Sequence, residues 1–321
     1  MCLPALPGLC AGAVRPTAVH LVYPVSYGSI PVYSGTVTGI SDGARRRPAP
    51  PLRPYVRSYD GYRLTGFAPG THLGLPSPDL TVVLTIGAPV ELARAAAPGQ
   101  GPGRFGALAS GLATTAVTIA HDGNQHGIQL ALTPAGARVL LGVPAGALGA
   151  WVVDLEDVLG AAARELAERI AATAEWESRF RILDEVLARR LAAERGEIDA
   201  HLRHVWSRLQ DPRTPGVRIA DLADEIGWSR RHLNARFTAE FGVGPKEAAR
   251  VVRFDRSCRL LRRPGPHVLA DVAARSGFYD QAHLAREWRA IAGVPPSRWL
   301  RDEQFPIVQD GDPDADEHWQ P

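Results

Sequence analysis

The positions between residues 155 and 195 alternate between apolar and polar with a helical period. Apolar residues recur every three or four positions with charged residues between them, which is typical of amphipathic helices. The first series is Leu155, Val158, Leu159, Leu166 and Ile170, and the second is Phe180, Leu183, Val186, Leu187 and Leu191. We expect a connector of two helices, whose apolar stripe packs either on a neighbouring part of the chain or on a second copy in a homodimer.

Short β-prone runs precede the connector. Between residues 52 and 154, LTVVLTI and GIQLALT alternate with turn sequences such as HLGLPSPD and HDGNQHG. This pattern predicts a β-rich domain of the barrel or sandwich type. Residues 1–51 are rich in Pro, Gly and Ser and have no sustained period, so we expect them to be mostly irregular or disordered. There, Arg45 to Arg47 are expected to belong to a solvated linker, with contact to nucleic acid as the alternative.

Residues 196–303 contain one pattern twice. GWSRRHLNARFTAEFGVGPKEAA starts at Gly227 and GFYDQAHLAREWRAIAGVPPSRW starts at Gly277, an offset of 50, whereas Ser229 and Asp280 align at an offset of 51. The second turn therefore contains one inserted residue. In each copy a glycine suited to the left-handed conformation ends one helix, and Ser229 or Asp280 is expected to cap the next. Helix, tight turn and capped helix predict a helix-turn-helix unit, here present twice.

A long helix is predicted between the two units. PKEAARVVRFDRSCRLLRR begins at Pro245, a residue favoured in the first helical turn, and is long enough for about 25 Å of helix. A spacer of this length could set the two second helices into successive major grooves, which lie ~34 Å apart on one face of DNA.

The second helix of each unit has one apolar face and one polar face. Leu233, Phe237 and Phe241 in the first, and Leu284 and Trp288 in the second, are expected to face the core. Arginine can donate twice to guanine, and asparagine or glutamine can pair twice with adenine. Outward polar residues are otherwise ordinary solvated surface. The outward residues are Arg231, Asn234, Ala235 and Thr238, then Gln281, Ala282, Ala285, Arg286 and Arg289.

Charge is distributed unevenly along the chain. The formal net charge is +2, but residues 228–263 contain 10 Lys or Arg against 3 Asp or Glu. An anionic partner such as DNA would meet this stretch first. The tail, residues 304–321, has 5 acidic residues and no Lys or Arg. We expect this tail to be disordered, with folding back over the basic face as the alternative.

Residues 197–302 resemble the DNA-binding domain of the AraC/XylS family of bacterial transcription regulators. SGFYDQAHLAREWRAIAGVPPSRW, which begins at Ser276, is similar to that family's second-motif signature. The resemblance implies seven helices, binding to double-stranded promoter DNA, and activation through contact with RNA polymerase. It implies base-facing positions for Arg231, Asn234 and Ala235 in the first unit and for Gln281, Ala282 and Arg286 in the second, and we add Ser229, Arg230, His283 and Arg289 to the expected DNA-binding set.

The two alanines among these positions depart from the polar residues often found in the family. Ala235 and Ala282 can offer at most methyl contacts. Arg231, Asn234, Gln281 and Arg286 would therefore carry most of the direct base recognition.

The upstream region resembles the uncharacterised β-rich N-terminal domain of a subset of these regulators. LRPYVRSYDGY, PDLTVVLTIGAPVEL, GIQLALTPAGARVLLGVPAGAL and VVDLEDVLG follow one another in the expected order. The resemblance implies a module that senses an unknown small-molecule effector or one that oligomerises. The alternative function is accordingly a DNA-binding protein whose N-terminal domain only oligomerises and senses no ligand.

Other classes of protein fit the sequence less well. No apolar run approaches the ~20 residues of a membrane span, and MCLPALPGLCAGAV lacks the basic start of a signal peptide, so we expect a cytoplasmic protein. Cys2, Cys10 and Cys258 are too few for a disulfide framework or a zinc site. They also do not supply the Pro-Cys-His nucleophile and cysteine-rich zinc module of the alkyltransferases that share this kind of unit, so we expect no enzyme.

A metal site is also not expected. The candidate ligands are His72, Glu91, His121 and His126, but no two of these histidines stand at His-x-His or His-x-x-x-His spacing. We expect turn or surface histidines and no metal or other cofactor.

Together these patterns predict an α+β protein with a β-rich barrel- or sandwich-like domain, a helical connector and an all-α domain with two helix-turn-helix units. The expected boundaries are 1–51, 52–154, 155–195, 196–303 and 304–321.

Overall fold

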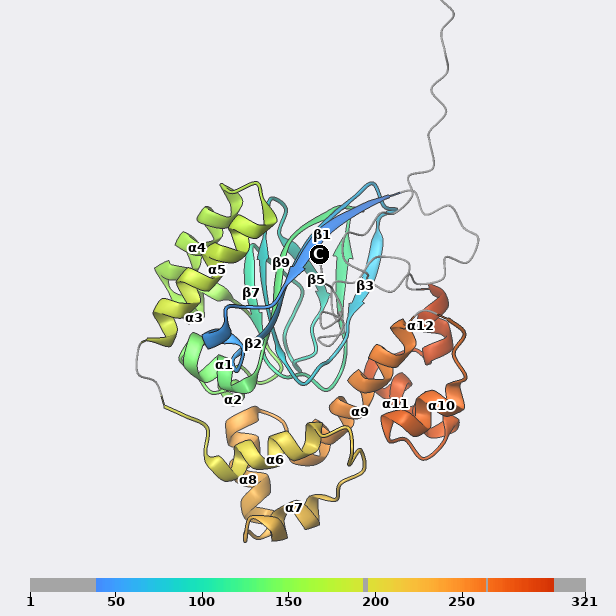
Figure 1. The fold of residues 1–321 in the computed structure, drawn as a ribbon. Helices are drawn as coiled ribbons and strands as arrows, with labels where there is room; N and C mark the ends of the chain where they lie inside the picture. The colour runs from blue at the N-terminus through green and yellow to red at the C-terminus, as the bar shows by residue number, and fades with distance from the viewer. Residues whose placement is uncertain (1–38, 193–195, 264, 303–321) are drawn as a thin grey trace, which may run out of the picture.

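The computed structural model describes residues 39–192, 196–263 and 265–302. A β-rich part lies beside a layer of helices, and two helical units follow toward the C-terminus (Figure 1). This arrangement confirms the predicted α+β class. Cys2, Cys10 and the acidic tail from residue 304 lie outside the described residues.

Two antiparallel sheets form the β-rich part, so it is sandwich-like. In the six-stranded sheet the order is β1 (Ile40–Arg46), β2 (Val56–Thr65), β9 (Gln125–Leu132), β4 (Leu80–Thr85), β7 (Ala107–Ser110) and β10 (Val152–Asp154). In the four-stranded sheet it is β3 (Gly70–Gly74), β8 (Val117–His121), β5 (Val90–Arg94) and β6 (Gly103–Phe105). The runs LTVVLTI and GIQLALT form β4 and β9 as predicted, and most of their apolar residues are buried.

Strand β1 corrects the expectation that the chain is irregular up to residue 51. It pairs with β2 in register from Ile40 opposite Thr65 to Arg46 opposite Tyr59. Arg45 binds Asp60 with 3.1 Å between Nε and Oδ1, and Arg46 binds Glu177 and Asp184 of the connector. These two arginines are therefore ion-pair partners within the fold and not part of a solvated linker.

The connector has three helices where two were expected. They are α3 (Leu155–Leu159), α4 (Ala161–Ala171) and α5 (Trp176–Leu191). Gly160, with φ +61°, separates α3 from α4, because a residue in that conformation cannot continue a right-handed helix. Leu166, Ile170, Phe180 and Leu183 are buried in the core shared with the β-rich part. These residues of the apolar stripe pack within the chain, and the homodimer stays a prediction.

Seven helices follow among the described residues, and the apolar residues expected to face the core are buried. Phe237 and Phe241 of the first unit pack on Trp206, and Trp288 of the second packs on Phe254. The helices are α6 (Ala200–Gln210), α7 (Ile219–Glu225), α8 (Arg230–Phe241), α9 (Pro245–Arg262), α10 (Leu269–Ser276), α11 (Gln281–Ala292) and α12 (Pro296–Asp302).

Short helices and loops of the β-rich part contact both units. The short elements are α1 (Pro134–Gly136), η2 (Ala137–Leu141) and α2 (Ala145–Leu148), and η1 (Pro50–Leu52) lies against α5. The core of the first unit is continuous with that of the β-rich part, and Leu75 and Ala116 belong to the core of the second. None of the helices in the described part of the chain has the length and apolar character needed to span a membrane.

Candidate nucleic-acid interface

The first helix-turn-helix unit is closed by a glycine and a serine cap. Gly227 has φ +70°, which favours glycine and ends α7. Ser229 Oγ accepts a hydrogen bond from the His232 amide at 3.2 Å, which satisfies one of the unpaired N–H groups at the start of α8. The predicted cap is confirmed, and α8 starts with its N-terminal face open to solvent.

The second unit repeats this arrangement with a different cap. Gly277 has φ +85°, and Asp280 Oδ1 accepts from the His283 amide at 2.6 Å. Phe278 is buried beneath the turn, and its ring meets the ring of His283 edge to face with 5.4 Å between centroids. The inserted residue of this turn is Tyr279, and it is almost fully exposed.

The candidate base-reading residues are on the solvent faces of α8 and α11. Among the residues the structure describes, neither Arg231 nor Arg286 has an ion-pair partner, so both guanidinium groups are available to an external acceptor. Their contacts with DNA stay predictions. The exposed members of the expected set are Ser229, Arg230, Arg231, Asn234, Ala235, Gln281, Ala282, Arg286 and Arg289, and His283 is half-buried because it braces the turn.

Several arginines of the basic stretch are used inside the protein. Arg250 of α9 binds Glu287 of α11 with 2.8 Å between Nε and Oε2, and Arg259 binds Asp255. Burial lowers the pKa of Arg253 and of Arg256, as expected for cations withdrawn from water. The local charge excess therefore overstates the positive surface that α9 offers to DNA.

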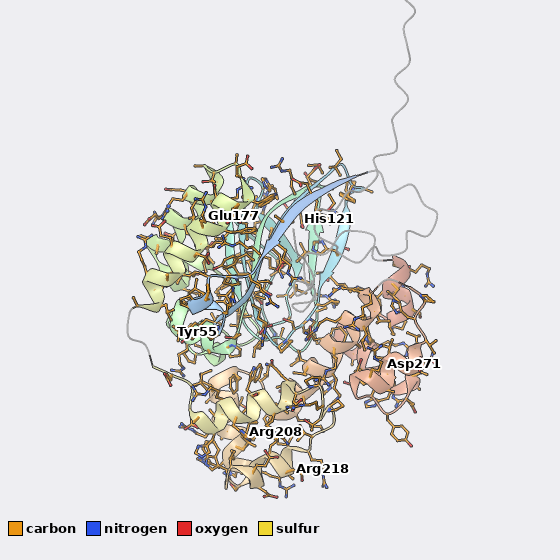
Figure 2. The ribbon with its side chains drawn as sticks, in the orientation of Figure 1. Tyr55, His121, Glu177, Arg208, Arg218 and Asp271 are labelled. Atoms are coloured by element: carbon orange, nitrogen blue, oxygen red, sulfur yellow. The ribbon has the colours of Figure 1, made fainter. Side chains whose placement is uncertain are left out.

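Helix α9 joins the two units and contacts both of them. The Gly244 amide donates to Glu247 Oε2 at 3.0 Å at its start, and Pro245 lies in its first turn as predicted. Deeper in the helix, Ser257 Oγ accepts from the Trp288 indole N–H at 2.9 Å. Arg218, next to α7, and Asp271, in α10, mark the two separate units on either side of this helix (Figure 2).

The β-rich part contacts each unit at the C-terminal end of that unit's second helix. Arg138 binds Glu240 of α8 through two hydrogen bonds, with 3.0 Å between Nε and Oε1. At Gly146 a Cβ would lie 2.3 Å from the carbonyl oxygen of Ala239, so only glycine allows this approach. In the second unit, the Ala116 amide donates to the Ile291 carbonyl at 2.8 Å. Sequence reasoning missed these contacts, because no local pattern records which loops meet.

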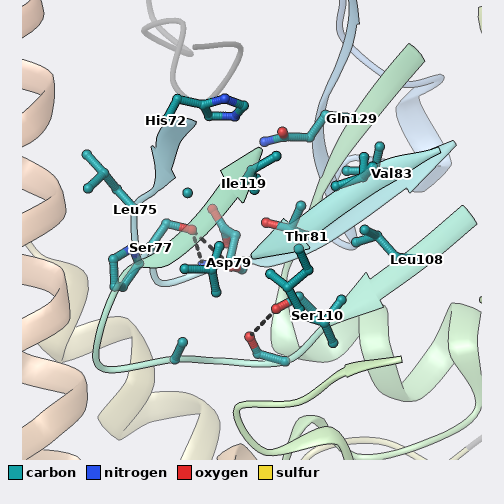
Figure 3. Close-up of a pocket in the computed structure, with 18 of the residues that line it drawn as sticks. His72, Leu75, Ser77, Asp79, Thr81, Val83, Leu108, Ser110, Ile119 and Gln129 are labelled. Carbon is teal, nitrogen blue, oxygen red and sulfur yellow. Dashed lines mark hydrogen bonds between the residues drawn. The ribbon is translucent and has the colours of Figure 1, made fainter. Parts of the chain in front are cut away.

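A cavity of about 100 Å³ opens between the two sheets (Figure 3). Uncharged polar side chains from both sheets face it, among them His72, Thr81, Ser110 and Gln129. Asp79 also lines it, but its carboxylate accepts from Arg57 Nε at 2.6 and 2.8 Å. The cavity thus suits a small uncharged molecule that makes hydrogen bonds.

Protonation of His72 is expected to destabilise the fold in acid. Burial, and to a smaller degree the neighbouring His121, lowers the pKa of His72 to about 4 from its ordinary value of about 6.5. The unfolded state then binds the proton first, so stability present above pH 6.5 is lost as the pH falls toward 4, by up to about 3 kcal/mol. Urea titrations between pH 7 and pH 4 give the free energy of unfolding as a function of pH. This free energy should fall less steeply with falling pH in His72→Gln than in the wild type, and parallel curves would contradict the prediction.

The four candidate metal ligands do not converge, and the expectation of turn or surface histidines is wrong for His72, which is buried in β3. The His72 and His121 rings lie 5.6 Å apart between centroids, whereas His126 packs on Trp176 and Glu91 binds Arg104. Within the described ranges no group of three or more His, Cys, Asp or Glu could hold a metal ion. Cys258 is buried in the core of the second unit, as expected of a small packing residue.

Comparison with known proteins agrees with this geometry. A family model described as "Helix-turn-helix domain" matches residues 222–302. A putative AraC-like transcription regulator of Streptomyces lividans is 34% identical over 88 residues, which cover 27% of this chain and 29% of that protein. The uncharacterized HTH-type transcriptional regulator YbfI of Bacillus subtilis is 29% identical over 83 residues, or 26% and 30% of the two chains. The match thus spans less than a third of each relative, and both relatives are named as transcription regulators.

A solved structure of ToxT from Vibrio cholerae is similar over 82% of this chain and 98% of that one, with a TM-score of 0.45 and 14% identity. The structure of CuxR, an AraC-like transcriptional activator, matches 65% of this chain and 83% of that one, with a TM-score of 0.27 and 16% identity. The repeated capped units, the joining helix and the matched model lead to one identification: residues 222–302 are a helix-turn-helix domain similar to that of AraC-like transcription regulators.

Proposed function

We propose that the protein binds double-stranded promoter DNA sequence-specifically, with α8 and α11 in two successive major grooves. The observation that carries this proposal is the pair of capped helices whose polar faces are open to solvent and whose separation is set by α9. Arg231 and Arg286 would each read a guanine, and Asn234 and Gln281 an adenine. Ala235 and Ala282 would touch thymine methyl groups.

Selection from a random library of double-stranded DNA tests this proposal. The full-length protein should enrich a sequence with two conserved blocks whose centres lie about 10–10.5 base pairs apart, the spacing of successive major grooves on one face. Enrichment of a single block would contradict reading by both units, and no enrichment would contradict sequence-specific binding. Activation through RNA polymerase rests on the family resemblance, and transcription from the enriched site in the presence and absence of the protein decides its direction.

We propose further that the β-rich part senses a small uncharged effector in the cavity between its sheets. Leu75 lines this cavity and also belongs to the core of the second unit. Thr115 and Val117 line it too, and the Ala116 amide between them donates to the Ile291 carbonyl of α11. A molecule in the cavity would therefore contact the loops that pack and hydrogen-bond to the second unit.

A panel of small uncharged metabolites tests the effector proposal on the full chain. A compound that binds only the folded protein must raise its melting temperature, and it should raise that of Gln129→Leu less because Gln129 faces the cavity. The alternative is a β-rich part that only oligomerises. It predicts no compound-dependent shift in the wild type together with a concentration-dependent mass in sedimentation equilibrium.

A further inference from the structure

Tyr279 is the most exposed of the large hydrophobic side chains in the described part of the chain. It is 93% exposed, compared with 61% for Val268, 58% for Ile40 and 47% for Trp151. Single exposed apolar residues are common on protein surfaces and need no explanation by themselves. The position of Tyr279 distinguishes it, because it directly precedes Asp280, the cap of the second recognition helix.

Tyr279 is also the residue by which the two turns differ. Trp228 is followed at once by the cap Ser229, whereas Phe278 is separated from the cap Asp280 by Tyr279. The insertion leaves the rest of the unit intact, since both caps accept from the amide three residues later. The second turn thus has one more aromatic side chain than the first, while the helices that follow the two turns, α8 and α11, each have 12 residues.

The backbone that carries Tyr279 is braced. Its amide donates to His283 Nδ1 at 3.2 Å, and the His283 ring packs edge to face on buried Phe278. Asp280 then continues in extended conformation, with φ −155° and ψ 176°, into α11. Tyr279 therefore lies at the N-terminal end of α11, two residues before the candidate base-reading residue Gln281, with its backbone fixed and its side chain in solvent.

We propose that Tyr279 is a DNA-backbone contact of the second unit, with its ring against a deoxyribose and its hydroxyl donating to a phosphate oxygen. This inference rests on the proposed function. The N-terminal residues of a recognition helix contact base edges, so the residue just before the cap meets the strand that borders the groove. Tyrosine hydroxyls are among the side-chain groups that donate to phosphates, and such contacts position a protein without reading sequence. The first unit has no residue at this place, so the second would have the additional anchor.

Binding of the full chain to two duplexes tests the inference, one duplex carrying the selected sequence and one a scrambled sequence. Tyr279→Ala should lower the affinity about tenfold on both, because a phosphate contact acts uniformly across sequences, and Tyr279→Phe about threefold through loss of one hydrogen bond. The salt dependence should keep its slope, since tyrosine neutralises no phosphate. Val268→Ala removes another exposed apolar side chain of the same unit and should bind like the wild type.

Three results would overturn the inference. Wild-type affinity of Tyr279→Ala on both duplexes would show that the side chain touches no DNA, whatever other partner it has. A loss confined to the selected duplex would show a base contact in place of a backbone contact. If Tyr279→Ala lowered the melting temperature markedly below that of the wild type and of Val268→Ala, its loss of affinity would reflect a structural role. If the wild-type protein bound neither duplex, the proposed function would fail together with the inference. If Arg286→Ala lost its preference for the selected duplex while Tyr279→Ala kept the wild-type affinity, the inference alone would be rejected.

Discussion

Replacing Trp288 by alanine is expected to lower the free energy of unfolding by about 3–5 kcal/mol and to remove binding by the second unit. Trp288 is fully buried and packs on Phe254 and Trp299, with 4.7 and 5.2 Å between ring centroids. Its indole N–H donates to Ser257 of α9, so the substitution also breaks the link between α11 and the joining helix. Thermal and urea unfolding measure the loss directly.

Two further variants control for this result. Trp288→Phe keeps an aromatic ring in the core, so it should lower the free energy of unfolding by less than the alanine variant does. It still leaves the Ser257 hydroxyl without its indole donor and should therefore be less stable than the wild type. Arg298→Ala removes only an exposed ion pair with Asp302 in the same unit and should leave the free energy of unfolding almost unchanged. If Trp288→Ala unfolded like Arg298→Ala, the core assigned to the second unit would be wrong.

Features set by neighbouring residues could be predicted from the sequence. The caps Ser229 and Asp280, and the glycines before them, lie within a few positions of the helices that they end or start, and both turns are observed as expected. The apolar faces of α8 and α11 follow the helical period for the same reason. The sequence marks Tyr279 only as the extra residue of the second turn, and an extra turn residue does not by itself indicate a binding contact.

Features set by distant residues could not be predicted. Strand β1 forms because β2 supplies its hydrogen-bond partners, and Arg46 is fixed by Glu177 and Asp184, more than a hundred residues away in sequence. The basic count over α9 likewise includes Arg250, which Glu287 neutralises. Charge and composition give no information on such pairings, because they depend on which elements become neighbours after folding.

The double variant Arg231→Ala, Arg286→Ala is expected to lose most of the sequence preference. Each arginine is exposed on a different recognition helix, and each bidentate contact with guanine discriminates by about 1–3 kcal/mol. The two side chains lie on separate units with no shared contact, so their effects should add to about 2–6 kcal/mol. Arg164→Ala is the matched control, because it removes one exposed arginine from α4, in the connector.

The measurement that tests the central claim most directly is the ratio of affinities for the selected and the scrambled duplex, titrated at several salt concentrations. The logarithm of each affinity should fall linearly with the logarithm of salt concentration, because binding releases counterions from phosphates. The double variant should lose at least about thirtyfold in the ratio, whereas Arg164→Ala should keep that of the wild type. A double variant with the wild-type ratio would show that α8 and α11 do not read DNA through these arginines.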